Sequence, residues 1–205
     1  MIPASPAIWL DGISWETYET LVRESAQGGS HVRITYDQGR MAMMSPLPIH
    51  EKWKQLIGRL IEVLAEERAV PLSAYGSTTW KREDLQRGLE PDQCYYVQHA
   101  PAMLGKVEID LRRDPPPDLA VEIEHTYPVL NRLHVYASLG IPEVWRYEGK
   151  TVAVLGLVEG DYEARQTSIA FPDFRPDELH RFLAMHPGQF DGEIAAAFRA
   201  WLRGE

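Results

Sequence analysis

Apolar side chains recur with two different periods along the first part of the chain. Residues 14–24 and 49–64 carry them every three or four positions, as on one face of an α-helix. Between these segments, residues 31–36 and 41–45 alternate apolar and polar side chains around Asp37-Gln38-Gly39. Two alternating segments joined by a short turn containing glycine are typical of a β-hairpin. This part of the chain therefore predicts a helix, a hairpin and a second, longer helix.

The remainder of the chain predicts short strands interspersed with helices. Strand-like runs occupy residues 72–80, 94–97, 117–124, 143–147, 151–157 and 166–170. Helical patterns occupy residues 128–139, which end at Gly140, and residues 176–202, which are broken at Pro187-Gly188. We therefore expect residues 1–205 to form one α/β (α+β) domain around a mixed β-sheet flanked by helices.

One of these strands is strongly acidic. Within residues 117–124, Asp118, Glu122 and Glu124 fall on one face, whereas the apolar side chains fall on the other. Carboxylates this close repel one another unless a cation lies among them. Alternatively, the acidic face is exposed to solvent, as one face of an alternating strand often is. The pattern alone leaves both interpretations open.

A second acidic cluster, Glu90-Pro91-Asp92, stands just before the strand predicted at residues 94–97. If this strand pairs with the acidic one, Asp92 and Glu122 can reach the same ion. Mg²⁺ commonly takes only one or two carboxylates and completes its octahedron with water and substrate phosphate. The two clusters therefore predict a site for Mg²⁺, or for Mn²⁺, in a phosphodiesterase.

Composition narrows the classes of function. The chain has 21 Lys and Arg against 30 Asp and Glu, and its net charge of −9 argues against a broad basic surface for duplex DNA or an anionic membrane. Cys94 is the single cysteine, which excludes an intrachain disulfide and favours a reducing compartment. No apolar run approaches the roughly 20 residues of a membrane span, and no secretory signal is visible. We therefore expect a cytoplasmic protein.

The chain also carries several longer motifs in a fixed order. They are Met43-Met44-Ser45-Pro46, Gly76-Ser77-Thr78-Thr79, Gly88-Leu89-Glu90-Pro91-Asp92, Pro117-Asp118-Leu119-Ala120-Val121-Glu122-Ile123-Glu124, Leu130-Asn131-Arg132-Leu133 and Gly140-Ile141-Pro142-Glu143-Val144-Trp145. Together these motifs resemble the Uma2 family of endonucleases in the PD-(D/E)XK superfamily. The resemblance implies a restriction-endonuclease-like core over residues 30–160, with an N-terminal helix and hairpin and a C-terminal helical extension at residues 173–205.

The resemblance also implies the roles of individual residues. Asp92 and Glu122 correspond to the two metal-binding acids of the superfamily, and Glu124 to an auxiliary acidic residue. The family supplies a lysine from the following helix, and the matching position in this chain is Arg132, which can bind phosphate but cannot readily release a proton. By the resemblance, His50, near the start of the long helix, corresponds to a residue that faces the metal site; taken by itself, it is more typical of a polar group at a helix entry. Nucleic acid, in particular DNA, is the implied partner, and a homodimer the implied assembly.

The preferred function is thus a Mg²⁺-dependent endonuclease, and two alternatives stay open. Arginine at position 132 favours a catalytically degenerate nuclease fold that serves as a binding or assembly module. The negative net charge permits instead a metal-dependent hydrolase of a small phosphorylated molecule. Glu143 could orient Arg132 through an ion pair, or it could stabilise the turn that follows Pro142.

Overall fold

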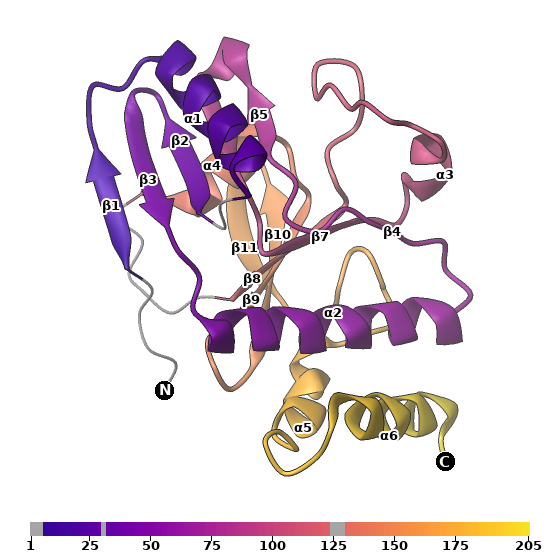
Figure 1. The fold of residues 1–205 in the computed structure, drawn as a ribbon. Helices are drawn as coiled ribbons and strands as arrows, with labels where there is room; N and C mark the ends of the chain where they lie inside the picture. The colour runs from indigo at the N-terminus through magenta and orange to yellow at the C-terminus, as the bar shows by residue number, and fades with distance from the viewer. Residues whose placement is uncertain (1–5, 30–31, 124–129) are drawn as a thin grey trace.

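The strands form two separate sheets in the computed structural model, which describes residues 6–29, 32–123 and 130–205 (Figure 1). The first sheet is antiparallel and contains, in spatial order, β1 (Ala7–Leu10), β3 (Arg40–Met44), β2 (Arg33–Asp37), β6 (Arg87–Leu89) and β5 (Trp80–Arg82). The second contains β11 (Asp161–Arg165), β10 (Val152–Val158), β9 (Glu143–Tyr147), β8 (Leu119–Ile123), β7 (Gln93–Tyr96) and β4 (Ser73–Ala74). In the second sheet β8 and β9 run parallel and the other neighbours antiparallel. This is the mixed sheet that the sequence predicts, and the antiparallel first sheet is an addition to it.

Helices pack on both sheets. They are α1 (Trp15–Gln27), α2 (Pro48–Glu67), α3 (Ala100–Met103), α4 (Arg132–Ser138), α5 (His180–Leu183) and α6 (Asp191–Arg203), with 3₁₀ turns at Glu83–Leu85 and Pro176–Leu179. In Figure 1, α1 lies over the first sheet, and α2 runs beneath the strands with α6 on its outer side. α4 contacts β6 of the first sheet and β11 of the second, so it lies between the sheets. This architecture confirms the expected fold class.

β8 lies inside the second sheet and is covered on both faces. Its odd-numbered side chains pack into the core formed with α2 and α6, namely Leu119, Val121 and Ile123. Ala120 points the other way, into a second core that contains Tyr136 of α4. Glu122 has the parity of Ala120, so it also points toward α4. The alternative of a solvent-exposed acidic face is therefore wrong for Glu122, whose side chain is only 15% exposed.

The N-terminal elements form as the sequence predicts. Ser14 caps α1 by accepting a hydrogen bond from the amide of Thr17 at 3.2 Å. β2 and β3 form the hairpin, and its two-residue turn has φ values of 48° at Gln38 and 89° at Gly39. Positive φ at both positions matches the twist of the flanking strands, and glycine adopts it without steric cost.

Two predicted elements differ from those observed. The strand predicted at residues 72–80 is two short strands, β4 and β5, which belong to different sheets. The helix predicted from residue 128 begins at Arg132, because Asn131 caps it by accepting a hydrogen bond from the amide of His134 at 3.2 Å. Residues 128 and 129 of that prediction lie outside the described ranges.

A third difference involves a buried carboxylate. The strand predicted at residues 166–170 is found instead at β11. Glu143 is fully buried and accepts hydrogen bonds from the amides of Ile169 at 2.8 Å and Ala170 at 2.7 Å, and from Trp145 Nε1 at 2.6 Å. The two amides thus donate to a carboxylate instead of to a neighbouring strand. Glu143 therefore holds this loop in place and does not orient Arg132. The predicted ion pair between Glu143 and Arg132 is wrong.

Glu143 should make stability depend on pH. Burial raises its pKa above the ordinary value of 4.5, against the opposing effect of its hydrogen-bond donors. The folded state therefore holds the proton more tightly than the unfolded state. This contribution to stability is fully present below the unfolded-state pKa and is lost as pH rises through the folded-state pKa.

We accordingly expect the urea midpoint of the wild type to fall, relative to that of Glu143→Gln, as the pH is raised from about 4 to about 7. The glutamine variant does not titrate at this position. Glu163→Gln, at an exposed position of β11, is the control and should follow the wild type. A difference between wild type and Glu143→Gln that stays constant over this range would contradict the shift.

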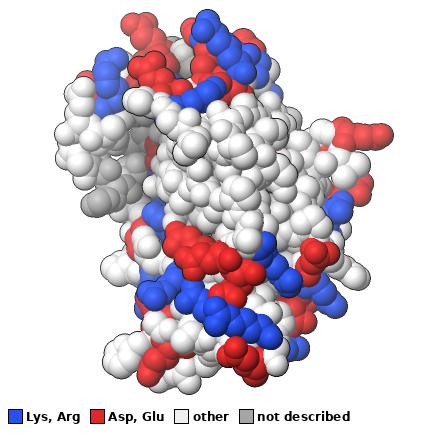
Figure 2. Space-filling view, turned by 90° about the vertical axis from the view of Figure 1, so that its right-hand side faces the viewer, with Lys and Arg blue, Asp and Glu red and all other residues white. Residues whose placement is uncertain are grey.

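Ion pairs as well as apolar contacts hold α6 against α2. Four pairs between described residues join the helices: Lys52 with Asp191, Arg199 with Glu66 at 2.5 Å and with Glu67 at 3.1 Å, and Arg203 with Glu67 at 2.8 Å. Figure 2 shows acidic and basic side chains side by side over the lower part of the molecule, where these helices lie. On this face the basic side chains are therefore balanced by acidic side chains next to them.

Within the described residues, no helix combines the length and the apolar character needed to cross a membrane.

Cys94 sits in the second core, which joins the two sheets. Its side chain is fully buried, and its Sγ accepts a hydrogen bond from Nε1 of Trp80 in β5 at 3.2 Å. The thiol also lies 3.3 Å from the carbonyl of Gly76, to which it donates. Burial raises the pKa of Cys94 to about 12, so the group stays a neutral thiol.

Candidate active site

β7 and β8 bring the two acidic clusters together. These strands pair antiparallel, with Gln93 opposite Val121. Continuing this register by one residue places Asp92 opposite Glu122. Directly opposed residues of an antiparallel pair project to the same side. The two carboxylates therefore lie on the same side of neighbouring chain segments, which is the strand pairing that a shared ion would require.

Glu122 is held by two residues one turn apart on α4. Nη2 of Arg132 donates to Glu122 Oε1 at 2.6 Å, and the Tyr136 hydroxyl donates to the same oxygen. Residues four apart on a helix lie on one face, so α4 presents both donors together. Burial, and then the charge of Glu122, raises the pKa of Tyr136 well above its usual value, which keeps the hydroxyl protonated.

Arg132 ties Glu122 to the first sheet. Its Nη1 donates to Oγ1 of Thr35 in β2 at 2.5 Å, and its Nη2 also donates to the carbonyl of Glu90 at 2.8 Å. Burial is the largest single influence and would lower the pKa of Arg132, but the charge of Glu122 and the contacts with Glu122 and Tyr136 together outweigh it and raise the pKa. Arg132 is therefore a permanently charged group held in one place, and it cannot act as an acid or a base.

Asp92 is bound from three directions and is 1% exposed. Its Oδ1 forms an ion pair with Arg33 of β2 and lies 3.6 Å from Nδ1 of His50, in the first turn of α2. Its Oδ2 accepts a hydrogen bond from the amide of Ile123 at 2.5 Å. That last contact fixes the carboxylate against β8, next to Glu122.

The donor set suits a hard divalent cation that needs few protein ligands. Asp92 and Glu122 offer carboxylate oxygens from adjacent chain segments, and Asp92 Oδ1 would have to exchange its ion pair with Arg33 for the metal ion. Across the described ranges, no three or more His, Cys, Asp or Glu side chains are grouped to hold a metal ion. Mg²⁺ tolerates such a set, because one or two carboxylates suffice and water and phosphate complete its shell. Glu124, the third predicted acid, lies outside the described residues.

Each of the two acids is paired with an arginine. Arg132 neutralises Glu122, and Arg33 neutralises Asp92. Arg132 is a candidate from the sequence, whereas Arg33, whose side chain is 6% exposed, is found only in the structure. Burial, as the largest cause, lowers the pKa of Arg33, against the acids nearby. A charged residue alternating with the apolar positions of a predicted hairpin strand is a signal that could have revealed it.

Asp118 lies apart from this site although it shares the parity of Glu122. Its Oδ2 accepts hydrogen bonds from the amides of Val97 at 2.7 Å and His99 at 2.9 Å, and its Oδ1 pairs with the His99 ring at 2.5 Å. Asp118 thus stabilises the turn that follows β7. Only two of the three acids predicted on one face therefore remain as candidates for the ion, and one of those two is Glu124, whose position lies outside the described residues.

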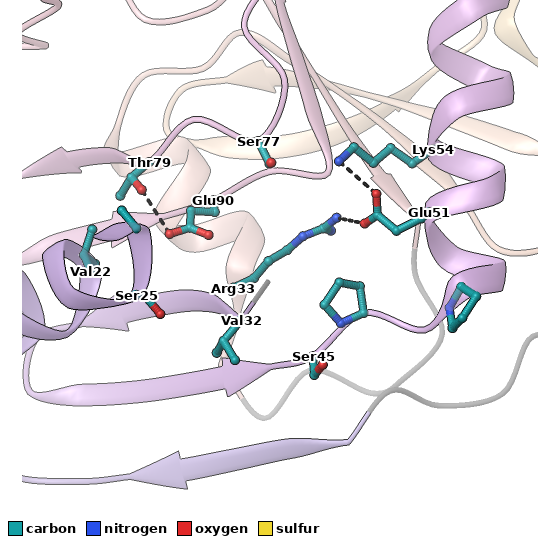
Figure 3. A pocket seen from close by; sticks show the side chains of 13 residues that line it. Val22, Ser25, Val32, Arg33, Ser45, Glu51, Lys54, Ser77, Thr79 and Glu90 are labelled. Atoms are coloured by element: carbon teal, nitrogen blue, oxygen red, sulfur yellow. Dashed lines mark hydrogen bonds and ion pairs between the residues drawn. The ribbon is translucent and has the colours of Figure 1, made fainter. Parts of the chain in front are cut away.

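A pocket of about 540 Å³ opens beside Arg33 (Figure 3). Within it, Nη2 of Arg33 pairs with Oε1 of Glu51 at 2.6 Å, and Nζ of Lys54 pairs with Oε2 of the same carboxylate at 3.1 Å. Arg33 contacts Glu51 in the pocket and Asp92 behind it. Its side chain therefore forms the wall between the pocket and the acid pair.

A profile of the Uma2 family, described as "Putative restriction endonuclease", matches residues 15–185 of the chain. This range contains Asp92, Glu122, Arg132 and His50, and it contains every strand of both sheets except β1. No curated protein matches the chain.

Proposed function

The chain belongs to the Uma2 family of restriction-endonuclease-like proteins, and from this premise we propose that it is a Mg²⁺-dependent endonuclease acting on nucleic acid, with DNA as the first substrate to test. The observation that most supports the proposal is the pairing of β7 with β8. It sets Asp92 opposite Glu122, with Arg132 bound to Glu122 at 2.6 Å. This arrangement combines two hard oxygen donors with the fixed cation of Arg132 on neighbouring inner strands of the second sheet.

In this proposal Asp92 and Glu122 hold Mg²⁺ or Mn²⁺, and Glu124 is an auxiliary acid. When bound, the ion polarises the scissile phosphate and supplies a water of lowered pKa. Arg132 binds the phosphate and stabilises the negative charge that develops on it. Because its pKa is raised, Arg132 holds its protons throughout. His50 lies 3.6 Å from Asp92 and positions that carboxylate.

The charge distribution limits how nucleic acid can bind. The net charge of the chain is −9. On the face shown in Figure 2, acidic side chains lie among the basic ones, so this face has no broad basic surface for a phosphate backbone. We therefore propose contacts confined to the vicinity of Arg132 and Arg33, with binding that weakens steeply as salt is added. The homodimer stays a prediction, which light scattering on the purified protein tests.

One observation favours the non-catalytic alternative. Both candidate acids already have arginine partners, and these satisfy the charge that a metal ion would otherwise neutralise. In that case the site is a buried ionic network that joins the two sheets, and the protein serves as a binding or assembly module. The two functions differ in whether divalent ions bind at all.

Glu122→Gln tests the proposed function. The amide keeps the shape of Glu122 and an acceptor for Arg132 and Tyr136 but removes the charge that a divalent ion requires. We expect Mg²⁺- or Mn²⁺-dependent plasmid nicking to fall by about 100-fold or more, with loss of metal binding in a calorimetric titration. Glu163→Gln, on the exposed strand β11, should retain both. A wild-type protein that binds neither ion and cleaves neither DNA nor RNA would overturn the proposal in favour of the binding module.

A further inference from the structure

The pocket beside Arg33 has two chemically different ends. At the end formed by α2, Arg33 and Lys54 share a single carboxylate, that of Glu51. The two cationic side chains are only 6% and 11% exposed, so solvent screens them poorly. Of the residues that line this end, two are cationic and one is anionic, and Arg33 also pairs with Asp92 outside the lining. Lys54 pairs with Glu51 alone of the acids named here, so it is the main contact for an anion such as a phosphate.

The opposite end is apolar with a hydrogen-bonding edge. Val22 and Ser25 of α1, together with Val32, lie on this side in Figure 3. Beside them, Oγ1 of Thr79 donates to Oε1 of Glu90 at 3.0 Å. Apolar walls can cover the faces of a planar ring, and a carboxylate can accept a hydrogen bond from an amino group on its edge.

The dimensions of the pocket restrict what can enter. Its volume of about 540 Å³ is that of a site for one small ligand. A double helix is too wide, because its major groove alone measures about 12 Å across. A single nucleotide, with its phosphate at one end and its base at the other, matches both the size and the two ends.

We propose that this pocket binds one unpaired nucleotide, with the phosphate against Arg33 and Lys54 and the base between α1 and the Thr79–Glu90 pair. The nucleotide is either free or part of a single strand, since both present the same chemistry. The pocket shares Arg33 with the acid pair, so in its link to cleavage this inference rests on the proposed function. The inference also predicts a preference among bases, because adenine, guanine and cytosine carry an exocyclic amino group for Glu90 and uracil does not.

The test is metal-free binding of nucleoside monophosphates to the full chain, measured by equilibrium dialysis in low salt. Ala26 of α1 lines the pocket, and its neighbour Gln27 is an exposed residue that does not. We expect Ala26→Trp to fill the pocket and weaken AMP binding at least tenfold, a change of about 1.4 kcal/mol. Gln27→Trp adds the same ring to the same helix and should bind AMP like the wild type.

A second variant tests the orientation of the ligand. Lys54→Gln should reduce the affinity for AMP by about tenfold and leave the affinity for adenosine nearly unchanged, because it removes one charged contact to phosphate. UMP should bind the wild type more weakly than AMP, CMP and GMP. Equal binding of AMP by wild type and Ala26→Trp, or no AMP binding by the wild type at millimolar concentration, would overturn the inference.

Competition distinguishes the two sources of the nucleotide. A single-stranded oligonucleotide that displaces labelled AMP, while its blunt duplex does not, identifies an unpaired nucleotide within a strand. Displacement by mononucleotides alone identifies a free nucleotide. Either result supports the pocket. Because no metal and no cleavage enter this test, its failure leaves the nicking experiment on Glu122→Gln untouched, and failure of that experiment leaves AMP binding as a separate result.

Discussion

Replacing Asp92 by alanine is expected to lower the free energy of unfolding by about 3–5 kcal/mol, because it leaves a buried charge without its partner. Asp92 is 1% exposed and Arg33 is 6% exposed. Arg33 keeps Glu51 as a partner at 2.6 Å, but the amide of Ile123 loses its acceptor. The loss therefore combines an incompletely paired guanidinium with an unpaired backbone amide.

Urea unfolding of the wild type and the variant measures this loss. Asp191→Ala is the control, since it removes an acid from the partly exposed pair with Lys52 and should cost no more than about 1 kcal/mol. The double variant Arg33→Met with Asp92→Leu should recover much of the stability, because an apolar pair can replace a buried ion pair. A loss below about 1 kcal/mol for Asp92→Ala would contradict the burial of this pair.

The size of this effect decides how the catalytic role of Asp92 should be tested. Loss of nicking by Asp92→Ala would follow from unfolding as readily as from loss of a metal ligand. Asp92→Asn keeps an acceptor for the Ile123 amide and nearly the same volume, so it separates the two causes better. Comparing it with Glu122→Gln then distinguishes an enzyme from a non-catalytic descendant of the same fold.

Arg132→Gln is expected to lower the rate of nicking by about 10²–10³-fold, the range found when one preorganised donor to a developing negative charge is removed. The reason is the fixed position of the guanidinium, which three groups hold: Thr35, Glu90 and Glu122. Arg132→Lys keeps the charge but lacks the planar fork that makes these contacts together. We therefore expect the lysine variant to recover only part of the rate.

Single-turnover nicking at saturating Mg²⁺ measures the effect on the chemical step. Arg87→Gln is a matched control, because Arg87 is 15% exposed, pairs with Asp37 at 2.7 Å and contacts His134 of α4 at 2.8 Å. It also links the first sheet to α4 but lies outside the acid pair. Nicking by Arg132→Gln at the wild-type rate, or an equal loss in Arg87→Gln, would remove Arg132 from the mechanism.

Periodicity in the sequence predicts those elements whose local pattern and final environment agree. The stripe on α2 is apolar because that face lies on the second sheet, and the hairpin of β2 and β3 has both alternation and a turn with glycine. The acidic strand is predicted because apolar and acidic side chains alternate along it, although both of its faces are covered in the structure. Leu119 enters one core, while Glu122 faces the other side toward α4.

The elements that the sequence misses depend on distant partners. β1 and β6 are four and three residues long and carry too little alternation to mark a strand; pairing with β3 and β2 makes them strands. Residues 166–170 are predicted as a strand, yet Glu143, 25 or more positions earlier, accepts hydrogen bonds from the amides of Ile169 and Ala170 and from the hydroxyl of Ser168. The site follows the same rule. Asp92, Glu122 and Arg132 come from motifs, whereas the alternation around Arg33 marks it as unusual but does not say that it reaches Asp92.

The reactivity of Cys94 can report separation of the two sheets. It is the single cysteine of the chain, and its Sγ is buried between β5 and β7, where the two sheets meet. A thiol-reactive reagent needs both access and a thiolate, and the folded protein withholds both. Alkylation of Cys94 therefore requires the two sheets to separate. Its rate measures how often they do so, in protein that carries neither a label nor a mutation. If a divalent ion or a nucleotide stabilises the junction between the sheets, the same thiol should react more slowly in its presence.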